Sequence, residues 1–196
     1  QINITEAASM EGVVRIFTYK DIPGKNQIGG IIPDETLLAT DEVHYMGMPV
    51  VLVVADSAEI AAAAVKKITI EIEKYPVVTN PRTAHANGSL IVPPRTFKIG
   101  DSENTFENCT HIFEGVAETN GQEHLYIETQ GAYAIPGENN SIRIISSTQG
   151  PTAVQKHSSE VLGIAMHCVE VDTTRLGGGF GGKEDQATSW AVFCAL

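Results

Sequence analysis

The sequence has few cysteines, no excess of basic residues and no long apolar run, and each absence excludes a class of protein. Its three cysteines (Cys109, Cys168 and Cys194) are widely spaced, which is typical of reduced thiols and provides neither a disulfide framework nor a cysteine metal site. The formal net charge is −11, so we expect neither nucleic acid nor an anionic membrane as a partner. No apolar run approaches the roughly 18 residues of a membrane span. These features together predict a cytoplasmic protein.

The composition is that of a globular chain large enough to bury a core. Hydrophobic residues make up 42% of the 196 residues and charged residues 19%, an ordinary balance for a folded protein. The first segment, "QINITEAASM", does not begin with methionine, and the last, "QATSWAVFCAL", is an apolar helical pattern without a cap. We therefore expect a fragment of a longer chain.

The first half of the sequence predicts a strand, helix and strand after an initial strand at 12–19. Residues 49–56, "PVVLVVAD", form a valine-rich run that indicates a strand buried on both faces. Ser57 can cap a helix over 58–67, which is rich in alanine. The alternation of apolar and polar residues over 68–78 indicates a half-buried strand. These elements predict a compact α/β unit.

The second half follows a segment at 80–101 that is rich in Pro, Gly, Asn and Ser and reads as a linker. Beyond it the pattern predicts a meander of strands at 111–119, 126–136 and 141–148. A helix is expected over 152–163, with Pro151 at its start and Gly163 at its end. A strand at 167–176 then leads into a glycine loop, and a helix from 183 onward leads out of it.

That loop, "RLGGGFGGKED" at 175–185, holds five glycines in six residues, and three interpretations of it stay open. Gly177, Gly179 and Gly182 match the GxGxxG pattern of dinucleotide-binding folds. The same stretch also matches most of a phosphate-binding P-loop, but Glu184 stands where that motif needs Ser or Thr. The glycines alternatively allow tight packing between strand and helix. We expect Lys183 and Glu184 at a helix N-terminus, a position suited to an anionic or oxo ligand.

Four motifs in order resemble the molybdenum hydroxylases, the xanthine dehydrogenase and aldehyde oxidase family. In chain order they are the segment "TDEVHYMGMPVVLVVADSAEIAAAAVKKITIEIEKYPVV", the stretch "GQEHLYIETQGAYAIP", the turn "SSTQGP" and the loop "RLGGGFGGKED". The resemblance covers nearly the whole chain. It implies an α/β (α+β) fold, with an α/β-hammerhead region at 1–95 followed by the first part of a molybdopterin-binding domain at 96–196.

The resemblance also implies a chemistry. The family hydroxylates carbon next to nitrogen in heterocycles such as the purines xanthine and hypoxanthine, or oxidises aldehydes, with oxygen from water. The expected cofactor is molybdenum–molybdopterin, as Mo-molybdopterin or as Mo-pterin cytosine dinucleotide. Electrons leave through 2Fe-2S clusters and usually FAD on other domains or subunits. The expected partners are therefore an N-heterocycle, the remainder of the molybdenum domain and those redox domains, in an oligomeric parent protein.

The resemblance implies active-site roles for individual residues of this sequence. Gln149 matches the glutamine whose amide lies beside the metal's oxygen ligands. Phe180 with Gly178, Gly179 and Gly181 matches the loop whose backbone approaches the apical oxygen of molybdenum, where a Cβ would collide with the cofactor. Glu184 matches the glutamate that hydrogen-bonds the substrate ring in purine-hydroxylating members, and this favours an N-heterocycle over an aldehyde.

No catalytic residue of the family falls in this sequence. The general-base glutamate and the substrate-binding arginine are expected beyond Leu196, so we expect the fragment to be inactive by itself. His124, in the motif with Gln122, has no second ligand at metal spacing and is expected to make a structural hydrogen bond. An aldehyde-oxidising member, a non-catalytic α/β scaffold and a Rossmann-type nucleotide binder are the alternatives.

Overall fold

The computed structural model describes residues 1–195, and of Cys194 the backbone alone. The chain divides into two units. Unit 1 combines residues 1–71 with the chain from residue 123 onward, and unit 2 comprises residues 72–122. Both family motifs that carry predicted site residues lie in unit 1. The domain boundary near residue 95 stays a prediction.

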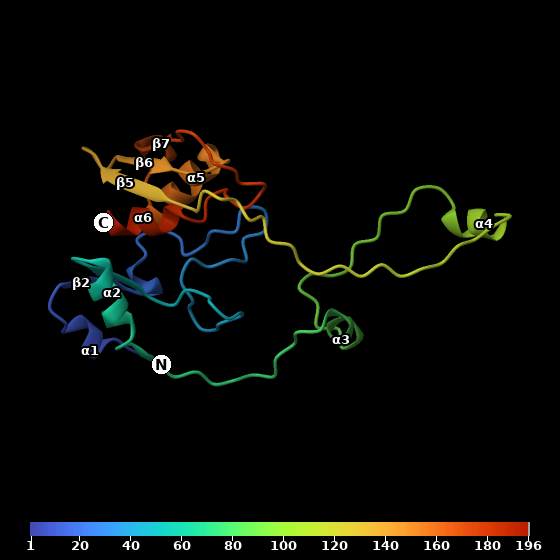
Figure 1. Cartoon of the computed structure of the whole chain (residues 1–196), viewed down its shortest axis with the longest axis horizontal. Coiled ribbons are helices and arrows are strands. Elements are labelled where there is room, and N and C mark those ends of the chain that lie inside the picture. Colours follow the sequence, from blue (N-terminus) through green and yellow to red (C-terminus); the bar gives the residue numbers. More distant parts are fainter. Residues whose placement is uncertain (196) are drawn as a thin grey trace. The chain divides into compact units, whose positions relative to one another are not determined.

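The first part of unit 1 contains two small antiparallel sheets and two helices (Figure 1). β1 (Ile2–Asn3) pairs with β4 (Thr69–Ile70), and β2 (Val13–Phe17) pairs with β3 (Leu52–Ala55). α1 (Thr5–Ala8) precedes β2, a 3₁₀ turn spans Tyr19–Asp21, and α2 (Ala58–Val65) follows β3. Ser57 caps α2 as predicted, because its side chain accepts a hydrogen bond from the backbone N–H of Ile60 at 3.3 Å.

Two predictions for this region were wrong in detail. β3 is half-buried along its whole length and not buried on both faces, because its two-stranded sheet has too few layers around it. The strand predicted over 68–78 is reduced to the two residues of β4. Its partner β1 also has only two residues, so the alternating side chains after Ile70 have no strand to pair with.

The second part of unit 1 is a three-stranded sheet covered by two helices. β5 (Ala132–Pro136) pairs antiparallel with β6 (Ile142–Ser146), and β6 pairs parallel with β7 (Val169–Asp172). α5 (Pro151–Leu162) and a 3₁₀ turn (Met166–Cys168) connect β6 to β7. The parallel pair is possible because α5 provides the crossover connection. Of the meander predicted at 111–119, 126–136 and 141–148, only the last two segments contain strands, which form the antiparallel pair of β5 and β6. α6 (Thr188–Cys194) follows the glycine loop.

One face of this sheet is apolar and the helices cover it. Ile142 and Ile144 of β6 are buried against Val154 of α5 and Val192 of α6, as the two-residue period of a strand requires. α5 begins with Pro151 and ends at Gly163, whose φ of +68° is the left-handed conformation of a helix C-cap. These two boundaries agree with the sequence prediction.

The two parts of unit 1 share a second core. Phe17 of β2 packs edge-on against Phe193 of α6, with ring centroids 5.0 Å apart. Leu37, Leu38 and Val161 of α5 complete this buried cluster. The backbone N–H of Gly24 also donates to the carbonyl of Val161 at 2.9 Å. The first part of unit 1 thus packs directly onto α5 and α6.

Unit 2 contains two short helices, α3 (Pro81–Ala86) and α4 (Ser102–Glu107), and otherwise has no regular structure. Asn80 caps α3, and Arg82 forms an ion pair with Glu118. The strand predicted at 111–119 does not form, because nearly all side chains of unit 2 are exposed and none supplies a packed sheet face. Neither α3, which lies within the segment interpreted as a linker, nor α4 was predicted. None of the described helices is long and apolar enough to cross a membrane.

Candidate functional site

The glycine loop connects β7 to α6 through residues 173–187, which are neither helix nor strand. α6 begins at Thr188. The prediction that Lys183 and Glu184 lie at a helix N-terminus was therefore wrong. The backbone of 179–182 turns back on itself instead, with the N–H of Gly182 donating to the carbonyl of Gly179 at 2.8 Å. The partial positive charge of a helix N-terminus therefore does not favour an anionic ligand beside Lys183 and Glu184.

Three residues of the loop adopt the left-handed backbone region. Gly178 and Gly181 have φ of +93° and +90°, values that glycine accepts without steric cost. Phe180 has φ of +54°, which costs a residue with a Cβ about 1–2 kcal/mol. Its side chain is 75% exposed. The loop thus presents an aromatic side chain on a strained backbone at the surface of unit 1.

The other glycines allow protein segments to approach closely. A Cβ on Gly177 would lie 2.6 Å from the Cβ of Glu128, and a Cβ on Gly179 would lie 2.3 Å from Oε1 of Gln149. A Cβ on Gly182 would lie 2.7 Å from the ring of Tyr126. At Gly181, by contrast, the nearest atom would be 3.8 Å away. Packing within the chain therefore accounts for the glycines at 177, 179 and 182 without any cofactor.

Gln149 is joined to the glycine loop through both its side chain and its backbone. Its Oε1 accepts a hydrogen bond from the N–H of Gly181 at 2.8 Å, and its own N–H donates to the carbonyl of Lys183 at 2.8 Å. The hydroxyl of Thr148 donates to the carbonyl of Glu184. The structure thus brings together two motifs more than thirty residues apart, and Gln149 remains exposed beside Gly181.

Lys183 is turned inward and belongs to a polar cluster that the sequence analysis did not assign. Its side chain is 0% exposed, and its Nζ donates to Oε2 of Glu128 at 2.7 Å and to Oγ of Ser147 at 3.0 Å. The ammonium lies 4.8 Å from the ring centroid of Tyr126. Ser147 and the N–H of Gly177 also donate to Oε2 of Glu128, at 2.6 and 2.8 Å.

These donors change the titration of Glu128. Its pKa is lowered to about 2, first by the hydrogen bond from Lys183 and then by those from Ser147 and Gly177. Glu128 is therefore a carboxylate throughout the neutral and mildly acidic range. A buried lysine paired in this way cannot reach a phosphate, so the P-loop interpretation was wrong. The dinucleotide interpretation also fails here, because the loop does not open directly into a helix.

Residues 126–130 belong to a motif of the family resemblance, but that resemblance assigns them no individual roles. Tyr126, Glu128 and Gln130 are half-buried, whereas the residues between them are exposed. Nε2 of Gln130 donates to the Tyr126 hydroxyl at 2.9 Å and to the carbonyl of Gly182 at 3.1 Å. The available signal was that Tyr126, Glu128 and Gln130 occupy every second position, because an extended chain places such residues on one side.

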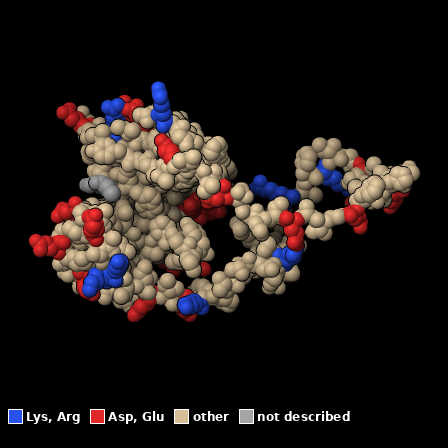
Figure 2. Space-filling view, viewed as in Figure 1, with Lys and Arg blue, Asp and Glu red and all other residues tan. Residues whose placement is uncertain are grey.

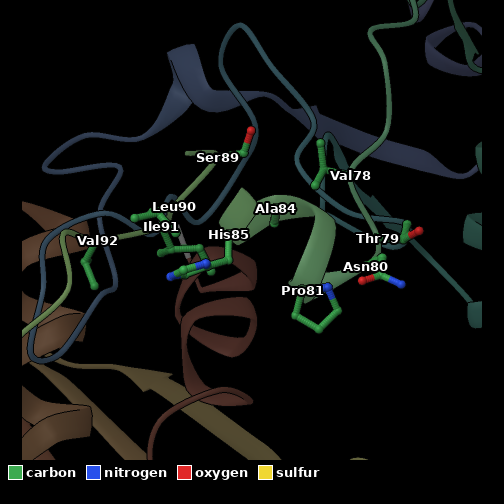
Figure 3. A pocket seen from close by; sticks show the side chains of 10 residues that line it. All are labelled: Val78, Thr79, Asn80, Pro81, Ala84, His85, Ser89, Leu90, Ile91 and Val92. Atoms are coloured by element: carbon green, nitrogen blue, oxygen red, sulfur yellow. The ribbon is translucent and has the colours of Figure 1, made fainter. Parts of the chain in front are cut away.

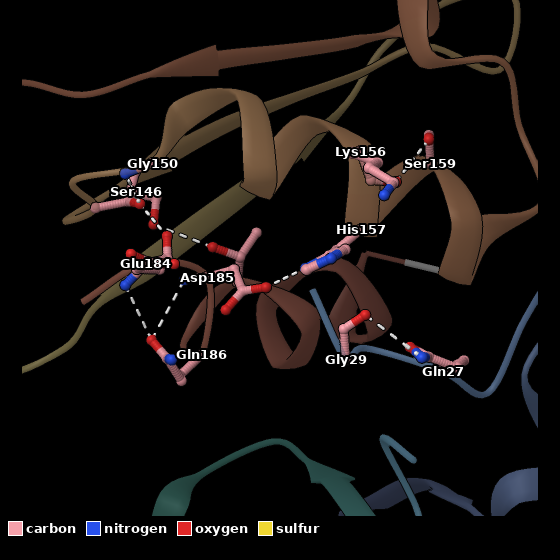
Figure 4. Close-up of polar contacts among 12 residues, drawn as sticks. Gln27, Gly29, Ser146, Gly150, Lys156, His157, Ser159, Glu184, Asp185 and Gln186 are labelled. Carbon is pink, nitrogen blue, oxygen red and sulfur yellow. Dashed lines mark hydrogen bonds and ion pairs between the residues drawn. The ribbon is translucent and has the colours of Figure 1, made fainter. Parts of the chain in front are cut away.

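The residues after Lys183 divide between solvent and the protein interior (Figure 4). Glu184 is exposed, and its carboxylate has no hydrogen-bond partner among residues 1–195. Asp185 turns inward and binds Nδ1 of His157 on α5, a histidine that is buried. The hydrogen bond that His157 donates to the Asp185 carboxylate raises the pKa of His157 despite its burial. This pair fixes the backbone immediately after Glu184.

His124 and Gln122, the other residues considered from the family motif, do not belong to the polar cluster around Lys183. His124 lies 3.7 Å from the carboxylate of Glu123, and its ring flanks Gly182. Gln122 belongs to unit 2. Within the described residues there is no group of three or more His, Cys, Asp or Glu side chains that fits a metal ion. A shallow pocket in unit 2, lined by residues 78–81, 84–85 and 89–92, contains none of the predicted site residues (Figure 3).

Comparison with known proteins identifies the family. Residues 1–76 match the family model described as "Aldehyde oxidase and xanthine dehydrogenase, a/b hammerhead domain". Residues 84–196 match the model of a molybdopterin cofactor-binding domain. The chain belongs to the aldehyde oxidase and xanthine dehydrogenase family. The hammerhead fold followed by a molybdopterin-binding domain, predicted from the sequence, is confirmed.

Individual relatives are similar over the whole chain. Xanthine dehydrogenase of Emericella nidulans is 36% identical over 99% of this chain, and that of Calliphora vicina is 38% identical over 100%. The chain spans 14% and 15% of the length of those two proteins. Among solved structures, the aldehyde oxidoreductase of Desulfovibrio gigas superposes with a TM-score of 0.84 at 26% identity, covering 99% of this chain and 24% of its own.

Proposed function

We propose that this chain supplies the first part of the molybdopterin site of a molybdenum hydroxylase whose substrate is an N-heterocycle of the purine type. The observation that carries the proposal is the 2.8 Å hydrogen bond from Gly181 to Gln149, which joins the two motifs that the family places around its metal. Both residues lie at the surface of unit 1. An exposed polar side chain held rigidly beside a strained loop is suited to a ligand that fits against it.

The residues present fit a molybdopterin group. Gln149 is exposed, its amide nitrogen has no partner within residues 1–195, and the space around Gly181 is open. An amide donates and accepts hydrogen bonds at once, so it suits oxygen ligands that change protonation. Gln149, Phe180 and Gly181, with Gly178 and Gly179 shaping the turn, would hold the group. When bound, it supplies the two-electron oxidation that introduces a water-derived oxygen into a C–H bond.

Glu184 is assigned to the substrate. Its backbone is held by Thr148 on one side, and the Asp185–His157 pair fixes the residue that follows. The carboxylate therefore remains at the surface next to the Gln149 turn and is available to accept a hydrogen bond from a ring N–H. The buried pair orients the backbone, and the exposed carboxylate binds. Curated relatives named xanthine dehydrogenase, at 36–39% identity, support a purine.

An aldehyde-oxidising enzyme is the second candidate, because the structural relative from Desulfovibrio gigas is an aldehyde oxidoreductase. We further propose that the complete protein is oligomeric and carries 2Fe-2S clusters and FAD on other domains or subunits. Its pterin is either molybdopterin or the cytosine dinucleotide form. Cys109 and Cys168 are free thiols, in keeping with the cytoplasmic location that we propose. Acidic and basic side chains both occur on the face shown in Figure 2.

The first experiment is elemental analysis of the complete protein, purified from its own cells with any accompanying chains. We expect about one molybdenum per copy, with iron alongside. A fully folded protein without molybdenum would contradict the proposal and favour the non-catalytic scaffold.

The substrate assignment is tested with Glu184→Val in the complete protein. Losing a hydrogen bond to a charged group costs about 1.5–3 kcal/mol, so kcat/KM for purines should fall about 10- to 100-fold. Turnover of aldehydes should change far less. Glu138→Val, at an exposed glutamate in the β5–β6 turn, is the matched control. Equal losses on purines and aldehydes would remove the substrate role of Glu184.

A further inference from the structure

A single carboxylate oxygen joins the two ends of the glycine-rich segment 177–183 within the glycine loop. Oε2 of Glu128 accepts hydrogen bonds from the N–H of Gly177, the first residue of this segment, and from Nζ of Lys183, its last residue. Both donors lie within 2.8 Å of the same atom. Closing a loop through one acceptor fixes its ends relative to each other, because either end can move only by breaking a charge-assisted bond.

The environment of Lys183 makes this closure specific. Its side chain is 0% exposed, and the ammonium is surrounded by Glu128, Ser147 and the face of Tyr126. Burying an ammonium is costly unless its donors are satisfied. An arrangement that kept the Lys183 side chain buried but moved it away from Glu128 and Ser147 would leave that charge without its partners. The pair therefore selects one loop conformation over others.

The same lysine is connected directly to Gln149. The carbonyl of Lys183 accepts the N–H of Gln149 at 2.8 Å, and the side chain of Gln149 accepts the N–H of Gly181 at 2.8 Å. A shift of Lys183 would therefore move the Gln149 backbone and the Gly181 amide together. Neither Glu128 nor Lys183 has to touch the cofactor for this effect.

We propose that Glu128 and Lys183 are positioning residues, which hold the glycine loop so that Gln149 and Gly181 face the molybdopterin site in one fixed geometry. This inference rests on the proposed function of that site. The lowered pKa of Glu128 agrees with it, because the carboxylate that closes the loop stays charged over the whole neutral range.

The test uses Lys183→Met, Glu128→Gln and the double variant in the complete protein, prepared without cofactor. We expect hydrogen exchange of the loop amides at 177–183 to accelerate about ten-fold in each single variant, the effect of losing one hydrogen bond to a charged group. The double variant should exchange no faster than the faster single variant, because both changes remove the same interaction. Additive effects would overturn the proposal.

The controls separate positioning from general destabilisation. Lys67→Met removes an exposed ion pair with Glu6 elsewhere in unit 1 and should leave loop exchange unchanged. Amides of β5 and β6 should keep wild-type exchange in the loop variants. Faster exchange throughout unit 1 would show a purely structural role and overturn the proposal. If Lys183→Met does not fold, Glu128→Gln decides, because it keeps an acceptor of nearly the same shape.

Activity provides a second readout in the cofactor-loaded protein. We expect kcat to fall about ten-fold while KM stays within about two-fold, because the substrate contact at Glu184 is retained. An unchanged kcat in folded, loaded variants would overturn the proposal. Wild-type protein without molybdenum would defeat the proposed function but not the loop closure, since exchange in the cofactor-free protein measures the closure independently.

Discussion

Replacing Gly179 by alanine should disconnect Gln149 from the glycine loop without unfolding the protein. The new Cβ would lie 2.3 Å from Oε1 of Gln149 and 3.0 Å from its Cδ. No real Cβ tolerates such a contact, but the obstructing atoms are the far end of a flexible side chain. The amide of Gln149 should therefore swing away and lose its 2.8 Å hydrogen bond from the N–H of Gly181.

The expected change in stability is the difference between the lost hydrogen bond and the reduced conformational freedom of the unfolded chain. One neutral hydrogen bond contributes about 1 kcal/mol. Alanine restricts the unfolded chain and returns about 0.4–1 kcal/mol where the backbone conformation suits it, and Gly179 does not have a positive φ. We expect the overall stability to change by less than about 1 kcal/mol. The Gly181 amide should nevertheless exchange about five-fold faster, the factor that corresponds to 1 kcal/mol.

The assay is residue-resolved hydrogen exchange on the complete protein, with molybdenum content measured alongside. In a Gln149→Ala background the Gly179→Ala change should have no further effect on Gly181, because the obstructing side chain is gone. Gly150→Ala is the control, since its Cβ would meet nothing closer than 3.4 Å. Unchanged exchange at Gly181 in Gly179→Ala, or an equal effect in the Gln149→Ala background, would refute the reasoning.

Two further predictions concern the support around the site. His157 has a pKa raised above 6.5 by Asp185, so the pair contributes stability that is full below about pH 6.5 and lost as pH rises through the raised pKa. The thermal midpoint of wild type minus that of Asp185→Asn should therefore shrink with rising pH, and a constant difference would contradict this. Gly24→Ala would place a Cβ 2.0 Å from the carbonyl oxygen of Glu160. It should lower the free energy of unfolding measured in urea by about 3 kcal/mol, whereas Gly30→Ala, with its nearest atom at 3.8 Å, should be nearly neutral.

Local signals predicted the elements whose stability is mainly local. α2 has its serine cap and alanine-rich body, and α5 lies between Pro151 and Gly163, so their boundaries could be read from the chain. Strands were predicted well where a partner of similar length exists, as for β2 and β6. The patterns at 68–78 and 111–119 are equally regular, but a strand forms only when another pairs with it.

The candidate site likewise combines features that the sequence indicated with contacts that only the folded chain creates. The resemblance indicated Gln149 and the glycine loop together, and the structure joins them at Gly181. It gave no role to Glu128 or Lys183, because an ion pair between residues 55 positions apart leaves no local signature. The start of α6 was placed too early for a similar reason. The carbonyls of Lys183 and Glu184 are bound by Gln149 and Thr148, which holds those residues in the loop.

The sequence by itself determined the family and the order of the two domains, and it predicted the residues around the proposed cofactor site, because ordered motifs are written in consecutive residues. Only the tertiary structure decided which glycines pack against protein, which acidic residue faces solvent and which lysine is buried. Those outcomes depend on how closely distant segments approach, and a difference of one or two ångströms decides whether a side chain is a ligand, an anchor or an obstacle.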